Sequence, residues 1–493
     1  MTGCSEPGSS GALNQNIDTQ SATIREQYVE REDAVNASLA ARQAYIPSRD
    51  SISSSLLNEF AATPSPGLSL ATAYSQLAAR IQKNPNWRAD PAIAEACCQL
   101  LNQAIYAGQQ PGDEDYERAL AWLMEIVEVS GRFGERPGPL EQWMSLDQSL
   151  VNAALHTALL GDYRLKDQSF FAFLPLWTMH QVQPDSDQAT RKAVTKFLIG
   201  QSQLYPSPNI QWWLENVPQP PIHLKRFDAV TLPADFPPPP SFGFYPQAAV
   251  VLWRSSWAPG ADGLVTHGAL ADDAATCLQA GNVSWTPHAE PVLVLGNEAT
   301  QGYAIGAEPN EDGAIMASLI PASSVIRVGE NQPEPGRAPI IVRELNDHSG
   351  NLRVNASELF PQLSIWHRDL FWKTGGELRI IDTISYDFGK RDRTSFFWRL
   401  SATEPVSIET DRKRTIVEWG ENAIVFQGNT PLEVDQFLVP VSATDPTPQV
   451  VIRLRTIGRP HSLRLLTRVL PRENVAPEEV VDMAKIPAST GAN

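Results

Sequence analysis

The side chains best suited to chemistry gather in residues 242–296. Arg254 comes directly after an apolar run and is followed by Ser-Ser-Trp257, while His288 and Glu290 come directly before a second apolar run. A guanidinium can bind a carboxylate through two parallel hydrogen bonds, so Arg254 is a candidate for holding an acidic ligand. Two alternatives stay open: a structural arginine that pins the end of a strand, and a loop histidine that is bonded only to its neighbours.

Residues 242–296 also mark a change in the hydrophobic pattern. Before them, apolar residues recur at helical spacing, as in residues 69–83, 91–108, 114–130, 146–160, 169–180 and 188–200. After them, nearly every segment alternates like a strand, and turn residues separate about a dozen runs, among them 248–253, 291–295 and 377–386. Because no long helical pattern interrupts these runs, we expect an antiparallel sheet with one buried face, stacked as a sandwich.

These patterns predict an α+β protein of two domains. We expect a disordered tether over residues 1–22, a helical domain over 23–216, and a Pro-rich linker over 217–241. An antiparallel β-sandwich then covers 242–471, and 472–493 form a disordered tail. Consecutive helical hairpins of this kind can stack into a toroid or a solenoid.

The composition of the chain narrows the range of functions that it could have. The 493 residues carry a formal charge of −17, which argues against a nucleic-acid binder but not against a local basic site for an acidic polymer. The four cysteines include no C-x-x-C pair, so a zinc-thiolate site is not expected. No apolar run approaches the roughly 20 residues of a membrane span. The motifs G-x-S-x-G, H-E-x-x-H and the P-loop are absent from the sequence.

The first residues, Met-Thr-Gly-Cys, resemble the end of a bacterial lipoprotein signal, in which the cysteine is lipidated. Cys4 would then be the lipid anchor, the polar residues after it the tether, and the bacterial cell envelope or periplasm the location. The alternative is a chance match of four residues.

The order of elements in residues 242–296 resembles the start of the β domain in heparinase II/III-like polysaccharide lyases. That order is apolar strand, Arg-Ser-Ser-Trp, short strand, loop, His-x-acid, apolar strand and Gly. The resemblance extends from about residue 93 to about residue 470, and residues 253–257 are the most similar to the sequence pattern of the family. It implies an (α/α) toroid, here incomplete, ahead of the β-sandwich. It also implies cleavage of uronic-acid-containing glycans by β-elimination in a cleft between the two domains.

β-Elimination requires that the uronate carboxylate be neutralised, that a base remove the C5 proton, and that an acid protonate the leaving oxygen. In the resembling family, a Tyr and a His or Asn from the helical domain share these roles with a His from the β domain. The resemblance makes His288 the best catalytic candidate, puts Glu290 in the place of the family's acid, and gives Arg254 the substrate carboxylate. Trp257 and Trp285 would stack on sugar rings, and core packing is the alternative for both.

Several features depart from the family pattern. The segment ahead of the helix near residue 146 contains no tyrosine, so Glu141 and Gln142 are the nearest substitutes that could line a cleft. A clear Asn-His signature is missing as well, and Asn102 is the one weak stand-in. The His/Asp grouping that binds metal in some members is not visible, so we expect no metal and no other cofactor.

Three functional hypotheses therefore stand. The first is an active lyase of acidic polysaccharides in the cell envelope, which the candidates His288 and Arg254 favour. The second is a catalytically degenerate relative that binds a glycan or a partner, which the missing tyrosine favours. The third is a glycoside hydrolase on a helical toroid, which would need two inward carboxylates.

Overall fold

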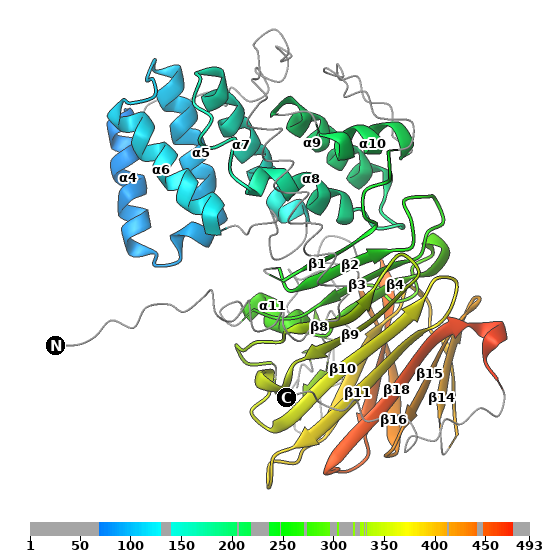
Figure 1. The fold of residues 1–493 in the computed structure, drawn as a ribbon. Coiled ribbons are helices and arrows are strands. Elements are labelled where there is room, and N and C mark those ends of the chain that lie inside the picture. The colour runs from blue at the N-terminus through cyan, green and yellow to red at the C-terminus, as the bar shows by residue number, and fades with distance from the viewer. Residues whose placement is uncertain are drawn as a thin grey trace. The chain divides into compact units, whose positions relative to one another are not determined.

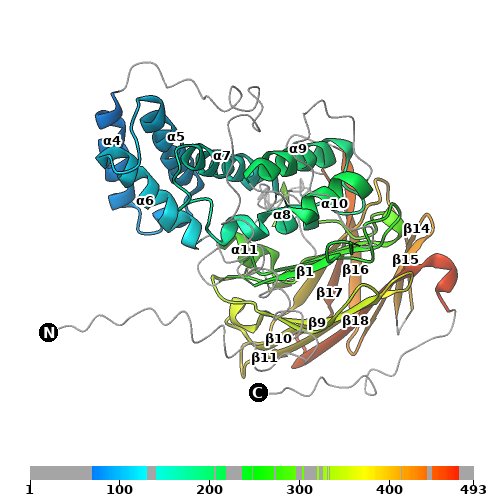
Figure 2. The same cartoon turned by 45° about the horizontal axis from the view of Figure 1, so that its top comes forward.

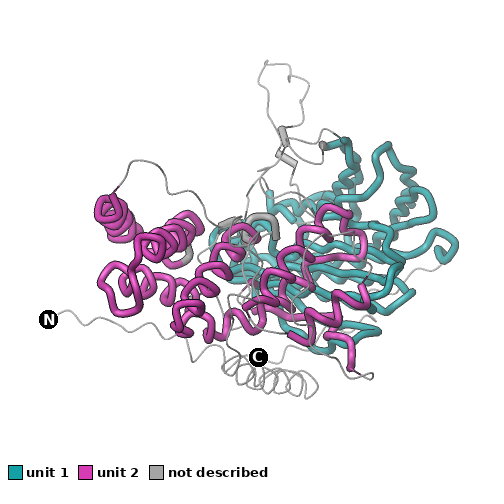
Figure 3. Tube along the Cα trace, turned by 90° about the horizontal axis from the view of Figure 1, so that it is seen from above, with its two compact units in different colours: residues 1–28, 249–493 teal, residues 29–248 magenta. Residues whose placement is uncertain are grey.

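The computed structural model describes thirteen stretches of the chain. They are residues 69–129, 140–204, 207–217, 236–246, 248–270, 274–295, 303–304, 319–320, 326–329, 331, 333–411, 414–440 and 447–476. The chain divides into two compact units, with the boundary between Ala248 and Ala249 (Figure 3). The first unit is mostly helical, and the second is mostly strands with the short helix α11 (Ala274–Gln279), so the chain is an α+β protein.

Seven α-helices make up most of the described part of the helical unit (Figure 1). They are α4 (Leu70–Lys83), α5 (Pro91–Tyr106), α6 (Glu114–Val129), α7 (Leu140–Leu159), α8 (Phe170–His180), α9 (Gln188–Leu204) and α10 (Pro208–Asn216). The short strand β1 (Phe242–Tyr245) also belongs to this unit.

Helix α5 shows how the sequence sets these boundaries. Asp90 caps its start, because one carboxylate oxygen accepts hydrogen bonds from the backbone N–H groups of Ala92 and Ile93. Pro91 occupies the first helical position, where no N–H is needed. Gly108 follows the end with a φ of 88°, a left-handed conformation that glycine adopts without strain. The helix is buried on most sides and lies between α6 and α7.

Two differences from the sequence-based expectation concern helix limits. Helix α7 starts at Leu140, six residues before the predicted start at residue 146. Helix α10 was not predicted, although Ser207 accepts a hydrogen bond from Ile210 N and Pro208 follows it, which is a regular helix start. The first part of the expected helical domain, residues 23–68, lies outside the described residues.

Within its described residues, the β unit contains three antiparallel sheets of three or more strands. The largest sheet has the order β13 (Ser407–Thr410), β14 (Thr415–Trp419), β15 (Asn422–Gly428), β18 (Ser462–Pro471), β11 (Leu378–Tyr386), β10 (Leu363–Lys373), β9 (Ser349–Asn355), β8 (Ile340–Leu345). A second sheet has the order β16 (Leu432–Pro440), β17 (Pro448–Thr456), β12 (Thr394–Arg399), β7 (Ile326–Val328). In the third, β2 (Val250–Arg254), β3 (Gly263–His267) and β4 (Val283–Thr286) pair in order. Figure 2 shows the long strands β9, β10, β11 and β18 side by side.

A fully buried arginine connects these sheets. Arg368 on β10 makes a two-bond ion pair with Asp382 on β11, at 2.9 and 3.0 Å. Its guanidinium also lies 4.9 Å from the ring centroid of Trp398 on β12, and its Nη1 donates to the carbonyl of Gly281 before β4. Because every partner is internal, this charge is satisfied inside the core of the β unit.

The predicted strand at residues 291–295 is not a strand. Leu293 makes only isolated bridges, to Trp285 and to Leu400, so the run crosses between sheets instead of extending one. The two short strands β5 (Tyr303–Ala304) and β6 (Leu319–Ile320) pair with each other. Most of the expected linker, residues 218–235, and the last part of the expected tail, residues 477–493, lie outside the described residues.

Candidate functional site

Arg254 ends strand β2 and is 3% exposed. Its Nε donates to the carbonyl of Ser256 at 2.8 Å, and its guanidinium lies 4.7 Å from the ring centroid of Trp257. Trp257 itself is 7% exposed. This geometry favours the structural alternative for Arg254, because the guanidinium is occupied by the end of its own strand and by a buried ring.

Trp285 on β4 is 1% exposed and stacks on Trp253 of β2, with ring centroids 6.2 Å apart and planes 15° apart. Trp253 in turn packs edge-on against Trp372 of β10. These rings therefore fill the core under the third sheet, which favours the packing alternative over sugar stacking.

His288 presents its ring to solvent, and its side chain is 72% exposed. The residue adopts a left-handed conformation, with φ 51° and ψ 35°, in a short 3-10 turn, Pro287–Ala289. Its neighbour Ala289 is also left-handed, with φ 59°. Glu290 follows the turn and is exposed, and its backbone N–H bonds the carbonyl of Pro287.

Asp262, 2% exposed, holds the His288 turn in place. One carboxylate oxygen accepts the backbone N–H of His288 at 2.8 Å and lies 3.6 Å from its ring Nδ1. The other oxygen accepts the N–H of Gly375 at 2.6 Å, in the turn between β10 and β11. Sequence reasoning missed Asp262, because it lies 26 positions before His288 and belongs to no recognised motif.

The remaining sequence-based candidates are less informative. The backbones of Glu141 and Gln142 lie in the first turn of α7, and their side chains lie outside what the structure describes. Cys4 lies outside the described residues as well. Among the described residues, no three His, Cys, Asp or Glu side chains are grouped as a metal site would require.

The helical unit contains a second cluster of side chains that could take part in acid–base chemistry. The cluster lies on facing turns of α5 and α7. The ring Nδ1 of His156 lies 2.8 Å from the side-chain oxygen of Asn102. Tyr106, one turn after Asn102, packs edge-on against the His156 ring, with centroids 6.1 Å apart, and is 54% exposed. Asn102 was the weak stand-in of the sequence analysis, and its histidine partner was missed.

The environment of His156 sets its protonation. The residue is 8% exposed, and burial lowers its pKa, so the ring is neutral at neutral pH. Since an amide oxygen only accepts, Nδ1 carries the ring proton and donates it to Asn102. The other nitrogen, Nε2, then carries a lone pair and can accept a proton. The two amide N–H groups of Asn102 are left as donors for an anion.

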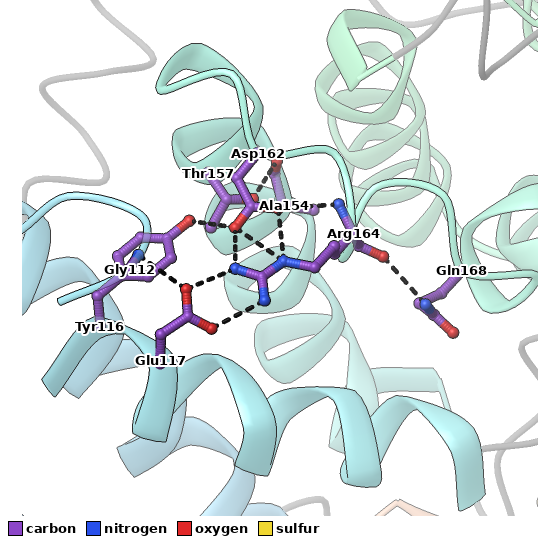
Figure 4. Close-up of polar contacts among 8 residues, drawn as sticks. All are labelled: Gly112, Tyr116, Glu117, Ala154, Thr157, Asp162, Arg164 and Gln168. Carbon is purple, nitrogen blue, oxygen red and sulfur yellow. Dashed lines mark hydrogen bonds and ion pairs between the residues drawn. The ribbon is translucent and has the colours of Figure 1, made fainter. Parts of the chain in front are cut away.

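Another tyrosine of the helical unit, Tyr116, has a different role. Tyr116 is fully buried and donates to Asp162 at 2.9 Å (Figure 4). Arg164 binds both Asp162 and Glu117, and Glu117 also accepts the N–H of Gly112. Burial and the bond to Asp162 raise the pKa of Tyr116, so this phenol is held protonated. The network joins α6 to the segment after α7 and is structural.

Comparisons with known proteins were made at the level of sequence and of fold. No protein-family model matches the sequence, and no curated protein is similar to it. Among solved structures, heparan sulfate lyase HepC from Pedobacter heparinus is similar, with a TM-score of 0.54 and 10% identity over 77% of this chain and 59% of that one. A heparinase III structure has a TM-score of 0.55 and 12% identity, covering 77% of this chain and 60% of the other.

These comparisons establish a structural relationship with heparinase III, and at such low identity they establish the fold alone. The chain spans about three fifths of the length of the lyases that it matches. None of the described helices is both long enough and apolar enough to cross a membrane.

Proposed function

We propose that this protein is a polysaccharide lyase that cleaves uronic-acid-containing glycans by β-elimination. The observation that carries the proposal is the Asn102–His156 pair beside Tyr106 in the helical unit of a heparinase-like fold. This pair supplies a neutral base and an amide donor from the helical unit, and it gives Asn102 the histidine partner that no sequence signature indicated.

The three requirements of the reaction can be assigned to named groups. The amide N–H groups of Asn102 bind the uronate carboxylate and make the C5 proton more acidic. Nε2 of His156 accepts that proton, and the electron pair forms the C4–C5 double bond as the bond from C4 to the glycosidic oxygen breaks. The exposed phenol of Tyr106 protonates the leaving oxygen.

The β unit contributes His288, whose ring is exposed to solvent and offers one nitrogen that donates and one that accepts a proton. Its proposed role is an acid or base toward a bound glycan. Glu290 is exposed close by and carries no separate role in the proposal. Arg254, Trp257 and Trp285 are buried, so we assign them to packing instead of to substrate binding.

The same burial favours a second candidate, a catalytically degenerate relative that binds glycan without cleaving it. Three of the side chains that the family resemblance put against the substrate are less than 8% exposed: Arg254, Trp257 and Trp285. A binding measurement with acidic polysaccharides separates this candidate from a protein with no glycan ligand. Appearance of an unsaturated product separates it from the lyase.

The finer features of the fold and location are also proposals. The helices would form part of an (α/α) toroid, and the stacking of Arg368 on Trp398 supports a β-sandwich. Attachment to a bacterial cell envelope through a lipid on Cys4 rests on the sequence. Mass spectrometry of the protein purified from bacterial membranes tests it, since a diacylglyceryl group on Cys4 is required.

The test of the function is an ultraviolet assay for the conjugated uronate, with alginate, heparan sulfate, chondroitin sulfate, hyaluronan and pectate as substrates. An active lyase gives a steady rise in absorbance on at least one of them. His156→Ala should abolish the rise, because the base is lost, while Gln103→Ala on the same helix as Asn102 serves as the control.

A further inference from the structure

The backbone around His288 is strained in a way that its own packing does not explain. His288 and Ala289 are consecutive left-handed residues, at φ 51° and 59°, and neither is glycine. Such conformations cost on the order of 1–3 kcal/mol each and persist when the surroundings impose them. The His288 side chain is mostly exposed, so burial of the ring does not offset this cost.

The contacts that impose the conformation converge on Asp262. Its carboxylate accepts the N–H of His288 with one oxygen and that of Gly375 with the other, at 2.8 and 2.6 Å. The preceding residue, Ala261, accepts the N–H of Ala289 at 3.0 Å. Two turns are therefore fixed to one buried carboxylate.

The His288 ring lies over the same carboxylate, with Nδ1 3.6 Å from the oxygen that already accepts its backbone N–H. This separation is longer than a hydrogen bond, and catalytic hydrogen bonds are often long in the absence of substrate. A carboxylate only accepts, so the side of the ring that faces Asp262 favours an N–H.

We propose that Asp262 is the positioning residue of His288, which holds the ring with Nδ1 protonated and leaves Nε2 as the proton acceptor that faces solvent. The use of that acceptor in glycan cleavage rests on the proposed function, whereas the ring's orientation and tautomer do not. In free histidine the opposite tautomer, with the proton on Nε2, predominates. The carboxylate therefore reverses the ordinary preference and presents a base outward.

The test is nitrogen NMR of the full chain labelled with ¹⁵N-histidine, because the shifts of the two ring nitrogens report which one carries the proton. The His288 signals are assigned by their loss in His288→Gln. The spectrum is recorded at a pH at which the ring is neutral. We expect the Nδ1–H tautomer to predominate in the wild type, and a predominant Nε2–H tautomer would overturn the proposal without any variant.

Asp262→Asn provides the second readout. An amide is uncharged and has only one accepting oxygen, so in either orientation it attracts a proton on Nδ1 of His288 less strongly than the carboxylate does. We expect the Nδ1–H population of His288 to fall, while Asp387→Asn, which removes a partly exposed carboxylate of the same unit, leaves it unchanged. An unchanged tautomer in a folded Asp262→Asn protein contradicts the proposal. Neither readout requires lyase activity, so the two proposals fail separately.

Discussion

Asn102 and His156 lie 54 positions apart in the sequence and are joined by a 2.8 Å contact between the amide oxygen and the ring Nδ1. The contact forms because α5 packs between α6 and α7, which brings the second half of α5 against the second half of α7. It fixes the ring proton on Nδ1 and leaves Nε2 as a base.

Replacing the amide by a carboxylate should lower kcat/KM, because the donors to the uronate carboxylate are lost, and should shift the pH dependence of the activity that remains. In Asn102→Asp the new charge stabilises the imidazolium and raises the pKa of His156, which burial lowers in the wild type. Because the base must be neutral, the acidic limb of kcat/KM against pH should move to higher pH. Gln103→Glu adds the same charge on the neighbouring position of α5 and should leave the limb in place.

The buried and the exposed tyrosine should respond oppositely to removal of the hydroxyl. Tyr116→Phe removes the bond to Asp162 and should lower the free energy of unfolding by about 1–2 kcal/mol. Tyr106→Phe should leave stability nearly unchanged, since Tyr106 is 54% exposed, but should reduce turnover. Urea unfolding and the lyase assay on both variants check this, and equal losses of stability would be evidence against a structural role special to Tyr116.

Acid should destabilise the protein through His267. Desolvation of its ring lowers the pKa of His267 to about 4, and its buried Nδ1 has no hydrogen-bond partner among the residues that the structure describes. The unfolded chain, with a histidine pKa of about 6.5, therefore binds more protons between these values, and stability rises with pH in that window. The contribution is complete above pH of about 6.5 and declines as pH falls to about 4, by at most about 3 kcal/mol.

The measurement for this histidine effect is urea unfolding across that pH range, with His267→Gln as the comparison. Glutamine does not titrate, so the variant should show a shallower decline than the wild type. Parallel curves for the two proteins would show that His267 is not the group responsible.

Removing one partner of the buried Arg368–Asp382 ion pair should lower the free energy of unfolding strongly, whereas replacing both partners by apolar residues should lower it little. Asp382→Asn leaves a guanidinium without its counter-charge in the core and should cost about 3–5 kcal/mol. The double variant Arg368→Met with Asp382→Leu removes both charges and should recover most of that loss. Chemical denaturation of the single and double variants measures both losses. A double variant as unstable as the single one would contradict the prediction.

Much of the fold could be predicted from the sequence because its signals are local. Asp90 and Pro91 define the start of α5 from adjacent positions, and the alternation in residues 377–386 predicts the strand β11. Helix α7 was predicted too short, because the segment before residue 146 lacks an evident apolar stripe. The run at 291–295 is apolar for another reason: Leu293 bridges two strands that are distant in sequence.

The candidate site could be predicted only in part, because its contacts are not local. His288 was named from its motif, yet its strained backbone and its anchor Asp262 depend on a turn 26 positions away. The partnership of Asn102 with His156 depends on how two helices pack, which no spacing rule encodes. Trp257 and Trp285 were also named from their place beside the motif. Both are buried, so their position reflects packing of the core and not substrate binding.

The measurement that tests the central claim most directly is the rate of unsaturated uronate formation by the wild type, His156→Ala, Asn102→Ala and Gln103→Ala on the acidic glycan that is cleaved fastest. The account predicts measurable cleavage by the wild type and by Gln103→Ala. It predicts a loss of about 100-fold or more in the other two variants, the usual contribution of a positioned base. Absence of product on every acidic glycan, or a wild-type rate in His156→Ala, would contradict it.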